Sequence, residues 1–229
     1  MKNIKIGFIG LGNVGSKLAG SILRNGFDLT VNDLNRERAQ LLIDKGAKWG
    51  ESPKKIVDST DMIITCLPSP KVSAKVMEDG NGILKGISYG KVWLEMSTTD
   101  EKEVKRLGEL VKKFGGEAAD CPVSGGCHRA ETGNISIFVG GERETFDKIL
   151  PVLKFMGRSI LHTGDLGSAS TLKVITNFLA TANLVSICEA LITARKAGLD
   201  LKTTYEAIRI SSGNSFVHET ESQVILNGS

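Results

Sequence analysis

The sequence predicts an α/β domain built on a doubly wound sheet, followed by an all-helical second domain that is incomplete in this chain. Through about residue 163, short apolar segments alternate with segments of helical periodicity, which is the pattern of a doubly wound sheet. From Gly167 onward, apolar residues recur at helical spacing only. The pattern changes near residues 164–167, so we expect a first domain over residues 1–163 and a second domain over residues 164–229.

The first elements of the chain surround a glycine-rich turn. An apolar segment over residues 4–9 leads into Gly10-Leu11-Gly12-Asn13-Val14-Gly15. The apolar face of a helix follows, formed by Leu18, Ala19, Ile22 and Leu23. A second strand-like segment, residues 28–32, then ends at Asp33. Strand, glycine turn, helix, strand and terminal carboxylate are, in this order, the parts of a Rossmann-type dinucleotide-binding unit.

Each glycine of this turn has a separate physical role. Gly10 permits the tight turn, Gly12 lets the backbone approach a pyrophosphate, and Gly15 lets the helix pack closely on the strand. The N-terminus of the helix presents unpaired N–H groups and a positive dipole end to phosphates. We therefore expect a nucleotide at residues 10–15, with a purely structural βαβ turn as the alternative.

The remaining elements continue the alternation and then abandon it. Strands are predicted over residues 62–67, 91–96 and 135–139. Helices are predicted over residues 99–113 with Thr99 as the cap, from about Thr145, from about Leu172 to Lys196, and over 201–210. The last third of the chain is thus expected to be entirely helical.

Composition limits the class of protein. The chain has 229 residues and a net charge of +3, with no basic run interleaved with aromatics, so nucleic acid is not expected as a partner. Apolar stretches look short and interrupted, so we expect no membrane span, and the N-terminus has no signal-peptide pattern. The four cysteines and three histidines show no metal-ligand spacing, which favours a reduced, cytoplasmic protein without a metal.

The helical second part raises a packing problem. Two or three helices over residues 164–229 bury little apolar surface by themselves. The chain also stops at residues 225–229, just past an apolar run. We expect either that this part pairs with a second copy, giving a homo-oligomer, or that more sequence follows in the parent protein.

Two motifs carry side chains suited to a small anionic substrate. Ser124-Gly125-Gly126 offers a hydroxyl and side-chain-free N–H groups, the chemistry of a carboxylate-binding nest, with a plain turn as the alternative. Lys173 and Asn177 are four residues apart, so both project from one helix face, where they can hold and polarise a substrate oxygen. A solvated surface lysine is the alternative for Lys173. The apolar neighbours favour the functional interpretation; they are Leu172, Val174 and Ile175.

Four motifs in order along the chain extend the glycine turn into a family pattern. They are Leu67-Pro68, Ser97-Thr98, Asp120-Cys121-Pro122-Val123-Ser124-Gly125-Gly126 and Lys173-Val174-Ile175-Thr176-Asn177. Over essentially its whole length the chain resembles the β-hydroxyacid dehydrogenases, the group containing 3-hydroxyisobutyrate dehydrogenase and tartronate semialdehyde reductase. The resemblance implies that Lys173 is the catalytic acid/base and Asn177 its partner. It also implies substrate contacts at Ser124, Gly125 and Gly126, cofactor contacts at Leu67, Pro68 and Thr98, and an oligomer assembled through the helical domain.

The chain departs from this family at three places. The family usually has two asparagines where this chain has Thr176-Asn177, and a glycine where this chain has Ala169. The family's C-terminal helix, which supplies a Lys-Asp pair near the nicotinamide, is not found before residue 229. We expect the first two to be tolerated and the third to leave part of the substrate pocket outside this sequence.

The expected function is that of an NAD(P)-dependent 3-hydroxyacid dehydrogenase or reductase. Such an oxidoreductase transfers hydride between a nicotinamide cofactor and a small, carboxylate-bearing β-hydroxy acid resembling 3-hydroxyisobutyrate. NAD is expected over NADP because Asp33 can accept both ribose hydroxyls and repel a 2′-phosphate, although Arg36 and Arg38 lie close by. The alternatives are a short-chain semialdehyde or glyoxylate reductase of the same family and a non-catalytic dinucleotide-binding module. Lys173 argues against an imine reductase.

Overall fold

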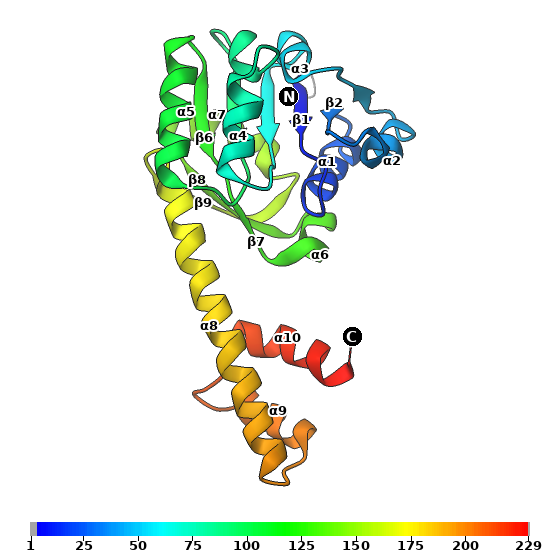
Figure 1. The fold of residues 1–229 in the computed structure, drawn as a ribbon, viewed down its shortest axis with the longest axis vertical. Coiled ribbons are helices and arrows are strands. Elements are labelled where there is room, and N and C mark those ends of the chain that lie inside the picture. Colours follow the sequence, from blue (N-terminus) through cyan, green and yellow to red (C-terminus); the bar gives the residue numbers. More distant parts are fainter. Residues whose placement is uncertain (1–3, 229) are drawn as a thin grey trace. The chain divides into compact units, whose positions relative to one another are not determined.

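The first part of the molecule is built on one large sheet. The computed structural model describes residues 4–228, and their nine strands follow the order β3-β2-β1-β4-β5-β6-β8-β7, with β9 paired to β8 (Figure 1). The strands are β1 (Lys5–Ile9), β2 (Asp28–Asn32), β3 (Lys48–Trp49), β4 (Met62–Thr65), β5 (Val92–Glu95), β6 (Glu117–Asp120), β7 (Val123–Ser124), β8 (Ile135–Gly140) and β9 (Gly157–Gly164). Neighbouring strands pair in parallel along β3-β2-β1-β4-β5-β6. Strand β8 is antiparallel to β6 and β7, and β9 is parallel to β8.

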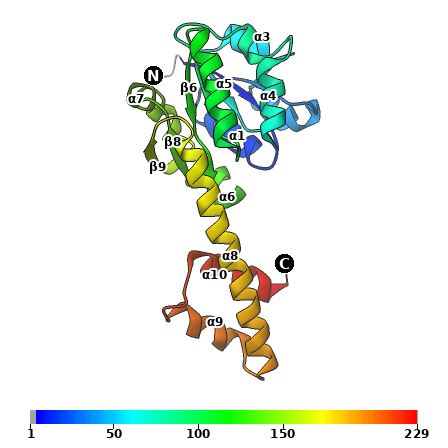
Figure 2. The same cartoon turned by 60° about the vertical axis from the view of Figure 1, so that its left-hand side comes forward.

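Helices cover both faces of this sheet, as the predicted fold class requires. One face carries α1 (Gly15–Arg24), α2 (Gln40–Ile43), α6 (Gly126–Glu131) and α7 (Arg143–Leu153), whose apolar residues share one core cluster. The other face carries α3 (Pro53–Ser59), α4 (Pro70–Glu78) and α5 (Glu101–Lys113). Helices α4 and α5 lie side by side, as Figures 1 and 2 show. Two short 3-10 helices complete the first part, η1 (Arg36–Ala39) and η2 (Ile83–Lys85).

The order of the strands creates a crevice at one edge of the sheet. Strands β2 and β3 lie on one side of β1, whereas β4, β5 and β6 lie on the other. The crossovers therefore run in opposite directions from β1 and β4, and the carboxyl ends of these two strands flank the point where ligands bind in open α/β sheets. The glycine turn follows β1 and Leu67-Pro68 follows β4, so the topology brings these two motifs together.

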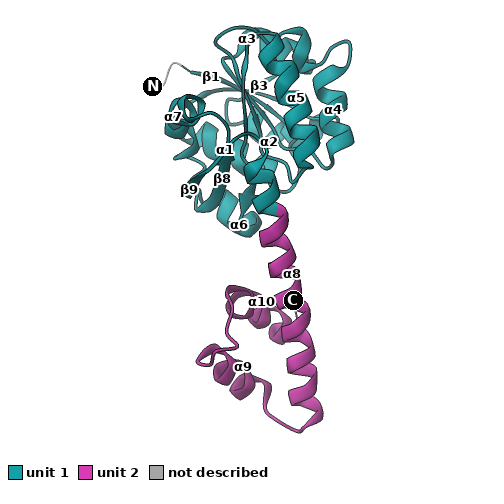
Figure 3. Cartoon of the chain, turned by 90° about the vertical axis from the view of Figure 1, so that its left-hand side faces the viewer, with its two compact units in different colours: residues 1–173 teal, residues 174–229 magenta. Residues whose placement is uncertain are grey.

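Contacts divide the chain into two compact units, Met1–Lys173 and Val174–Ser229 (Figure 3). Helix α8 (Ser168–Lys196) starts in the first unit and continues in the second, which also holds α9 (Leu201–Arg209) and α10 (Phe216–Asn227). The domain boundary expected at residues 163 and 164 stays a prediction. Buried residues of the second unit are Ile187, Leu191, Ala194, Tyr205, His218 and Ser222.

Helix α8 is long and strongly apolar. By length and composition alone it could cross a membrane, since it has 29 residues and an 18-residue window of it has a mean hydropathy of 1.5. The apolar stretches in it are interrupted by polar residues, as expected from the sequence, but the average over a helical window is still apolar enough to pass this test of length and composition, which was not expected of any segment from the sequence. One such helix is weak evidence for a membrane, because helices that pack against other protein have the same composition.

Most predicted elements are present, with differences at their ends. The helix expected over residues 99–113 starts at Glu101, and its cap is Asp100 instead of Thr99. The Asp100 carboxylate accepts a hydrogen bond from the Glu103 backbone N–H at 3.1 Å. Thr99 is buried in the loop before the helix. A carboxylate at this position also interacts favourably with the positive end of the helix dipole, which explains the shift of one residue.

Candidate active site

A cavity of about 1170 Å³ opens at the carboxyl ends of the central strands. All residues that line it belong to the first unit. Its lining contains most of the predicted site residues, namely Gly10, Gly12, Asn13, Val14, Gly15, Asp33, Leu67, Pro68, Thr98, Gly125, Gly126 and Lys173. Leu11 and Ser124 are close neighbours in the sequence but do not line the cavity. Asn177 lies in the second unit, one helical turn beyond Lys173 in α8.

The glycine turn has the geometry that a dinucleotide requires. Gly10 has φ = +98°, and a Cβ there would collide with the Cys66 carbonyl oxygen. A Cβ at Gly15 would collide with the Gly10 carbonyl oxygen, so the start of α1 packs directly on the end of β1. At Gly12 a Cβ would meet no atom of the described residues within 4 Å, and this glycine lines the cavity. The backbone here leaves room for a ligand to approach closely.

The start of α1 suits a phosphate. Val14 occupies the N-cap position, and no side chain of the described residues caps the helix. The Ser16 and Lys17 N–H groups donate to the Gly12 and Val14 carbonyl oxygens, so the contribution of this end of the helix to a ligand is mainly the positive potential of the helix dipole. Together with the open space at Gly12, this arrangement fits the pyrophosphate of a dinucleotide.

Asp33 stands at the end of β2, as the sequence predicts, and does two things there. Its Oδ2 accepts a hydrogen bond from the Leu11 backbone N–H at 2.7 Å, so the carboxylate fastens the glycine turn to β2. Its Oδ1 accepts one from the Asn35 N–H at 2.9 Å and lies 3.8 Å from Nη1 of Arg38. Arg38 also lines the cavity, whereas Arg36 stacks over the Trp49 ring at 5.4 Å. The cavity thus offers a carboxylate with a guanidinium beside it.

The ends of β4 and β5 are joined by a buried polar network that the sequence did not reveal. Ser97 Oγ accepts a hydrogen bond from the Leu67 N–H at 2.7 Å and donates one to Oε1 of Glu95. The Ser97 N–H donates to the same Glu95 oxygen at 2.9 Å. Glu95 is 1% exposed, and this burial raises the pKa of its carboxyl group. Through Ser97, the Leu67-Pro68 loop is fixed to the Ser97-Thr98 loop along the cavity wall.

Two successive glycines form the part of the wall expected to bind the substrate anion. Gly125 joins β7 to α6 and Gly126 begins α6, with φ = +126° and +80°, conformations that L side chains rarely adopt. Both line the cavity, and a Cβ at Gly126 would meet no atom of the described residues within 4 Å. Ser124 is half-buried, and its backbone pairs with Ser136 of β8. The structure therefore brings the two glycines to the cavity without placing the serine on its wall.

Lys173 is the one lysine of the cavity lining that is nearly buried. It is 8% exposed and stands near the start of α8, among the residues that line the cavity. Burial lowers the pKa of its ammonium below the usual value of 10.5, because the charged form loses hydration. The alternative of a solvated surface lysine is therefore wrong. An amine with a lowered pKa beside a ligand cavity is suited to proton transfer.

Other reactive side chains of the described residues have structural roles or unsuitable surroundings. His162 contacts the Gly141 carbonyl oxygen at 2.8 Å, and buried His218 contacts the Ser222 hydroxyl and the Tyr205 carbonyl. Cys66 lines the cavity, but burial raises the pKa of its thiol to about 12, which disfavours a thiolate nucleophile. Within residues 4–228, no group of three His, Cys, Asp or Glu side chains could hold a metal ion.

Comparisons with known proteins agree with this geometry. Residues 5–164 match the family model described as the NAD binding domain of 6-phosphogluconate dehydrogenase. Residues 167–229 match the model described as the NAD-binding domain of NADP-dependent 3-hydroxyisobutyrate dehydrogenase. Two family models thus divide the chain near the turn that precedes α8.

Individual relatives cover nearly the whole chain. It is 35% identical over 225 residues to 2-(hydroxymethyl)glutarate dehydrogenase of Eubacterium barkeri, covering 98% of this chain and 75% of that protein. It is 33% identical over 219 residues to the mitochondrial 3-hydroxyisobutyrate dehydrogenase of Rattus norvegicus, covering 96% of this chain and 65% of that protein. The structure of Mycobacterium tuberculosis 3-hydroxyisobutyrate dehydrogenase with L-serine superimposes with a TM-score of 0.88 at 27% identity, covering 95% of this chain and 74% of that one. The chain thus spans about two thirds to three quarters of the length of these relatives.

Proposed function

Because the chain belongs to the β-hydroxyacid dehydrogenase family, we propose that it transfers hydride between a nicotinamide dinucleotide and a small β-hydroxy acid resembling 3-hydroxyisobutyrate. One observation carries the proposal. A single cavity is lined by the glycine turn, by Asp33, by Gly125 and Gly126, and by the nearly buried Lys173. The cavity thus combines a place for a dinucleotide, a place for an anion and a group able to move a proton.

Lys173 is the proposed acid/base. The bound nicotinamide supplies the site for hydride, so the protein has to supply the proton and the electrostatics. In reduction, an ammonium within hydrogen-bond reach stabilises the developing alkoxide and protonates it. In oxidation, the neutral amine accepts the hydroxyl proton. Burial lowers the pKa of Lys173, which supports this second role by raising the neutral fraction near neutral pH.

Gly125 and Gly126 are proposed to bind the substrate carboxylate through their backbone N–H groups, with the Ser124 hydroxyl beside them. Support comes from their positive φ values and their place in the cavity lining. Asn177, one turn after Lys173 in α8, is proposed to bind the same substrate hydroxyl. In this proposal the glycines bind the substrate carboxylate, and Lys173 exchanges a proton with the substrate oxygen that reacts.

NAD is the proposed cofactor. The Asp33 carboxylate lines the cavity at the end of β2, where it can accept both hydroxyls of the ribose and would repel a 2′-phosphate. Arg38 is the residue that opposes this preference, since its guanidinium lies 3.8 Å from Asp33 and could meet a phosphate. Arg36 contributes less to that opposition, because it is stacked on Trp49.

A second copy of the chain is the proposed partner of the helical part. Phe178 is 70% exposed, Leu179 53% and Val185 54%, and all three lie in the second-unit part of α8. Apolar side chains exposed together on one helix indicate an interaction surface. A cytoplasmic location is also proposed, supported by the free state of all four cysteines.

The proposed function is tested by a steady-state screen of small hydroxy acids and their semialdehydes with NAD, NADP and the two reduced forms. The expected result is oxidation of short β-hydroxy acids with NAD. Turnover only in the direction of reduction, with semialdehydes or glyoxylate, would favour the reductase alternative. Tight NAD binding with no turnover of any substrate would favour the non-catalytic dinucleotide-binding alternative and contradict the proposal.

A further inference from the structure

Asp120 is a buried carboxylate that the proposed mechanism does not use. It ends β6 and is 0% exposed, although a charged side chain in this position loses its hydration. Burial raises the pKa of its carboxyl group, and hydrogen bonds, chiefly from Gly167 and Ser170, oppose that rise. Such a group is kept inside a protein only where its partners compensate for the lost water.

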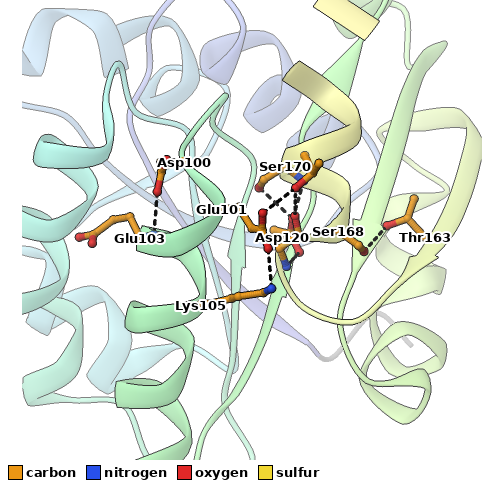
Figure 4. Close-up of polar contacts among 10 residues, drawn as sticks. Asp100, Glu101, Glu103, Lys105, Asp120, Thr163, Ser168 and Ser170 are labelled. Atoms are coloured by element: carbon orange, nitrogen blue, oxygen red, sulfur yellow. Dashed lines mark hydrogen bonds and ion pairs between the residues drawn. The ribbon is translucent and has the colours of Figure 1, made fainter. Parts of the chain in front are cut away.

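Asp120 accepts three hydrogen bonds, and their donors lie just before and in the first turn of α8, the helix that carries Lys173. Oδ1 of Asp120 accepts a hydrogen bond from the Gly167 N–H at 2.7 Å. Oδ2 accepts one from the Ser170 N–H at 2.7 Å and another from the Ser170 hydroxyl at 2.8 Å (Figure 4). Both carboxylate oxygens are thus used to hold residues 167–170. Charge-assisted bonds of this kind are stronger than neutral ones and are directional.

The neighbouring strand leaves room for this carboxylate. Gly140 of β8 pairs with Asp120 across the antiparallel ladder, and a Cβ at Gly140 would collide with Oδ1 of Asp120. The same Cβ would lie 2.8 Å from the Asp165 carbonyl oxygen and 2.9 Å from the Ser168 hydroxyl. A glycine is therefore required on β8 for the carboxylate and the turn to occupy the same space.

The link from Asp120 to Lys173 is short. Ser170 and Lys173 are three residues apart in α8, which places them on neighbouring positions of one helix face. A helix is a stiff element, so fixing Ser170 fixes the position of Lys173 one turn further along. Thr171, on the same turn, donates a hydrogen bond to Oε2 of Glu101 at 3.0 Å, but this contact is exposed.

We propose that Asp120 is a positioning residue for the proposed hydride transfer: by holding Gly167 and Ser170, it sets where Lys173 stands in the cavity. The inference rests on the proposed role of Lys173. Asp120 acts through the backbone of α8 and is not itself proposed to touch substrate or cofactor. Replacing it should misplace the proton-transfer group while leaving the glycine turn, which lies at the end of β1, intact.

The test compares three variants of the full chain. Asp120→Asn keeps the size of the side chain but turns one acceptor into a donor that faces N–H groups. We expect kcat to fall by about ten- to a hundredfold, the cost typical of a displacement near 1 Å. The Kd of NAD, measured by calorimetry, should stay within about threefold because the residues of the glycine turn are unchanged. Ser170→Ala removes one of the three bonds and should lower kcat by an intermediate amount. Thr171→Val is the control on the same turn, since it removes a hydroxyl that bonds to Glu101 and to the Gly167 carbonyl oxygen but leaves all three bonds to Asp120, and it should leave kcat within about twofold.

Hydrogen exchange supplies a readout that does not depend on activity. The amides of Gly167 and Ser170 should exchange faster in Asp120→Asn, whereas the amides of α1 should keep their rates. An unchanged kcat in Asp120→Asn, or a Kd for NAD that rises in parallel with the loss of kcat, would overturn the proposal. If Asp120→Asn does not fold, a Ser170→Ala enzyme with wild-type kcat overturns it instead. A wild-type enzyme that turns over no hydroxy acid contradicts the proposed function, and in that case faster exchange at Gly167 and Ser170 would still support the contact to Asp120.

Discussion

Replacing Lys173 tests the proposed mechanism at the one nearly buried amine of the cavity. Lys173→Ala removes the group that is to protonate the alkoxide, and no second lysine of the cavity lining is comparably buried: Lys75, which also lines it, is exposed. General acid–base catalysis contributes about 10²- to 10⁴-fold to a rate, and an ammonium also stabilises the developing charge. We therefore expect kcat to fall by at least about a thousandfold, which corresponds to about 4 kcal/mol.

The same burial predicts how activity depends on pH. Oxidation needs the neutral amine, so its rate should rise with pH and level off above the pKa of Lys173. Reduction needs the ammonium, so its rate should fall as pH rises through that pKa. Because burial lowers this pKa, the rise of the oxidation rate and the fall of the reduction rate should both occur below pH 10.5, the value that an exposed lysine would give. Lys173→Arg should also fail, since guanidinium hardly releases its proton and has a different shape.

The assay separates chemistry from cofactor binding. Steady-state kcat is measured in both directions, and the Kd of NAD is measured by calorimetry for the wild type, Lys173→Ala and Lys173→Met. The methionine variant keeps an unbranched apolar side chain in the same space, so it controls for the cavity that alanine would leave. NAD affinity should change by less than about threefold in both variants, because the phosphate site lies at the glycine turn. A Lys173→Ala enzyme that retained most of its kcat would move the catalytic role elsewhere and refute the mechanism.

Further outcomes follow from other residues of the site and of the helical part. Asp33→Ala should weaken NAD binding by about tenfold, because the carboxylate also holds the Leu11 N–H, and it should reduce the preference of the protein for NAD over NADP. If calorimetry finds that the wild type binds NADP as tightly as NAD, the proposed preference is contradicted. Gly125→Val should raise the substrate KM by about tenfold or more with NAD affinity unchanged, and Gly46→Val, which also adds a side chain at positive φ but outside the cavity, is its control; equal losses for substrate and nucleotide would assign Gly125 to the fold. Asn177→Ala should lower kcat less than Lys173→Ala does. An equal loss of kcat would contradict the proposal that Asn177 only binds the substrate hydroxyl. The wild-type chain should be at least dimeric by light scattering at micromolar concentration, and a monodisperse monomer would contradict the proposed pairing.

The fold was largely predictable because its signals are local. Apolar alternation and helical periodicity gave the class, and β1, α1 and β2 lie where the contiguous pattern around the glycine turn predicts them. Helices α3 and α4 were not predicted individually, although a serine cap followed by proline marks the start of each. Other elements that were not predicted have weak local signals. Strands β3 and β7 have two residues each, and β9 has a mixed pattern of exposed and buried positions. Such strands are specified by pairing with neighbours distant in the sequence, which no periodicity within a short segment records.

The residues of the site also differ in how far local sequence patterns predict them. Its glycines could be predicted, because a tight turn and a close approach each require glycine at a fixed place in a short motif. Lys173 was predicted from its motif, but its burial does not follow from the apolar residues beside it in the sequence, because Leu172, Val174 and Ile175 are exposed in the structure. Glu95 and Asp120 were not predicted as buried groups, since charged residues are usually assigned to the surface.

These two carboxylates become interpretable only through the register of the sheet. Glu95 and Asp120 are paired at the carboxyl ends of β5 and β6, and both are almost fully buried. Apolar residues of similar size would often stabilise such positions more than buried carboxyl groups do, so stability alone does not account for them. Both hold a segment next to the cavity: Glu95 holds Ser97, which lines the cavity, and Asp120 holds the first turn of α8, just before Lys173, which also lines it. Both carboxylates lie at the edge where ligands bind in such sheets, so the strands position the walls of the cavity through buried acidic side chains. No local sequence pattern distinguishes these acidic residues from those on the surface.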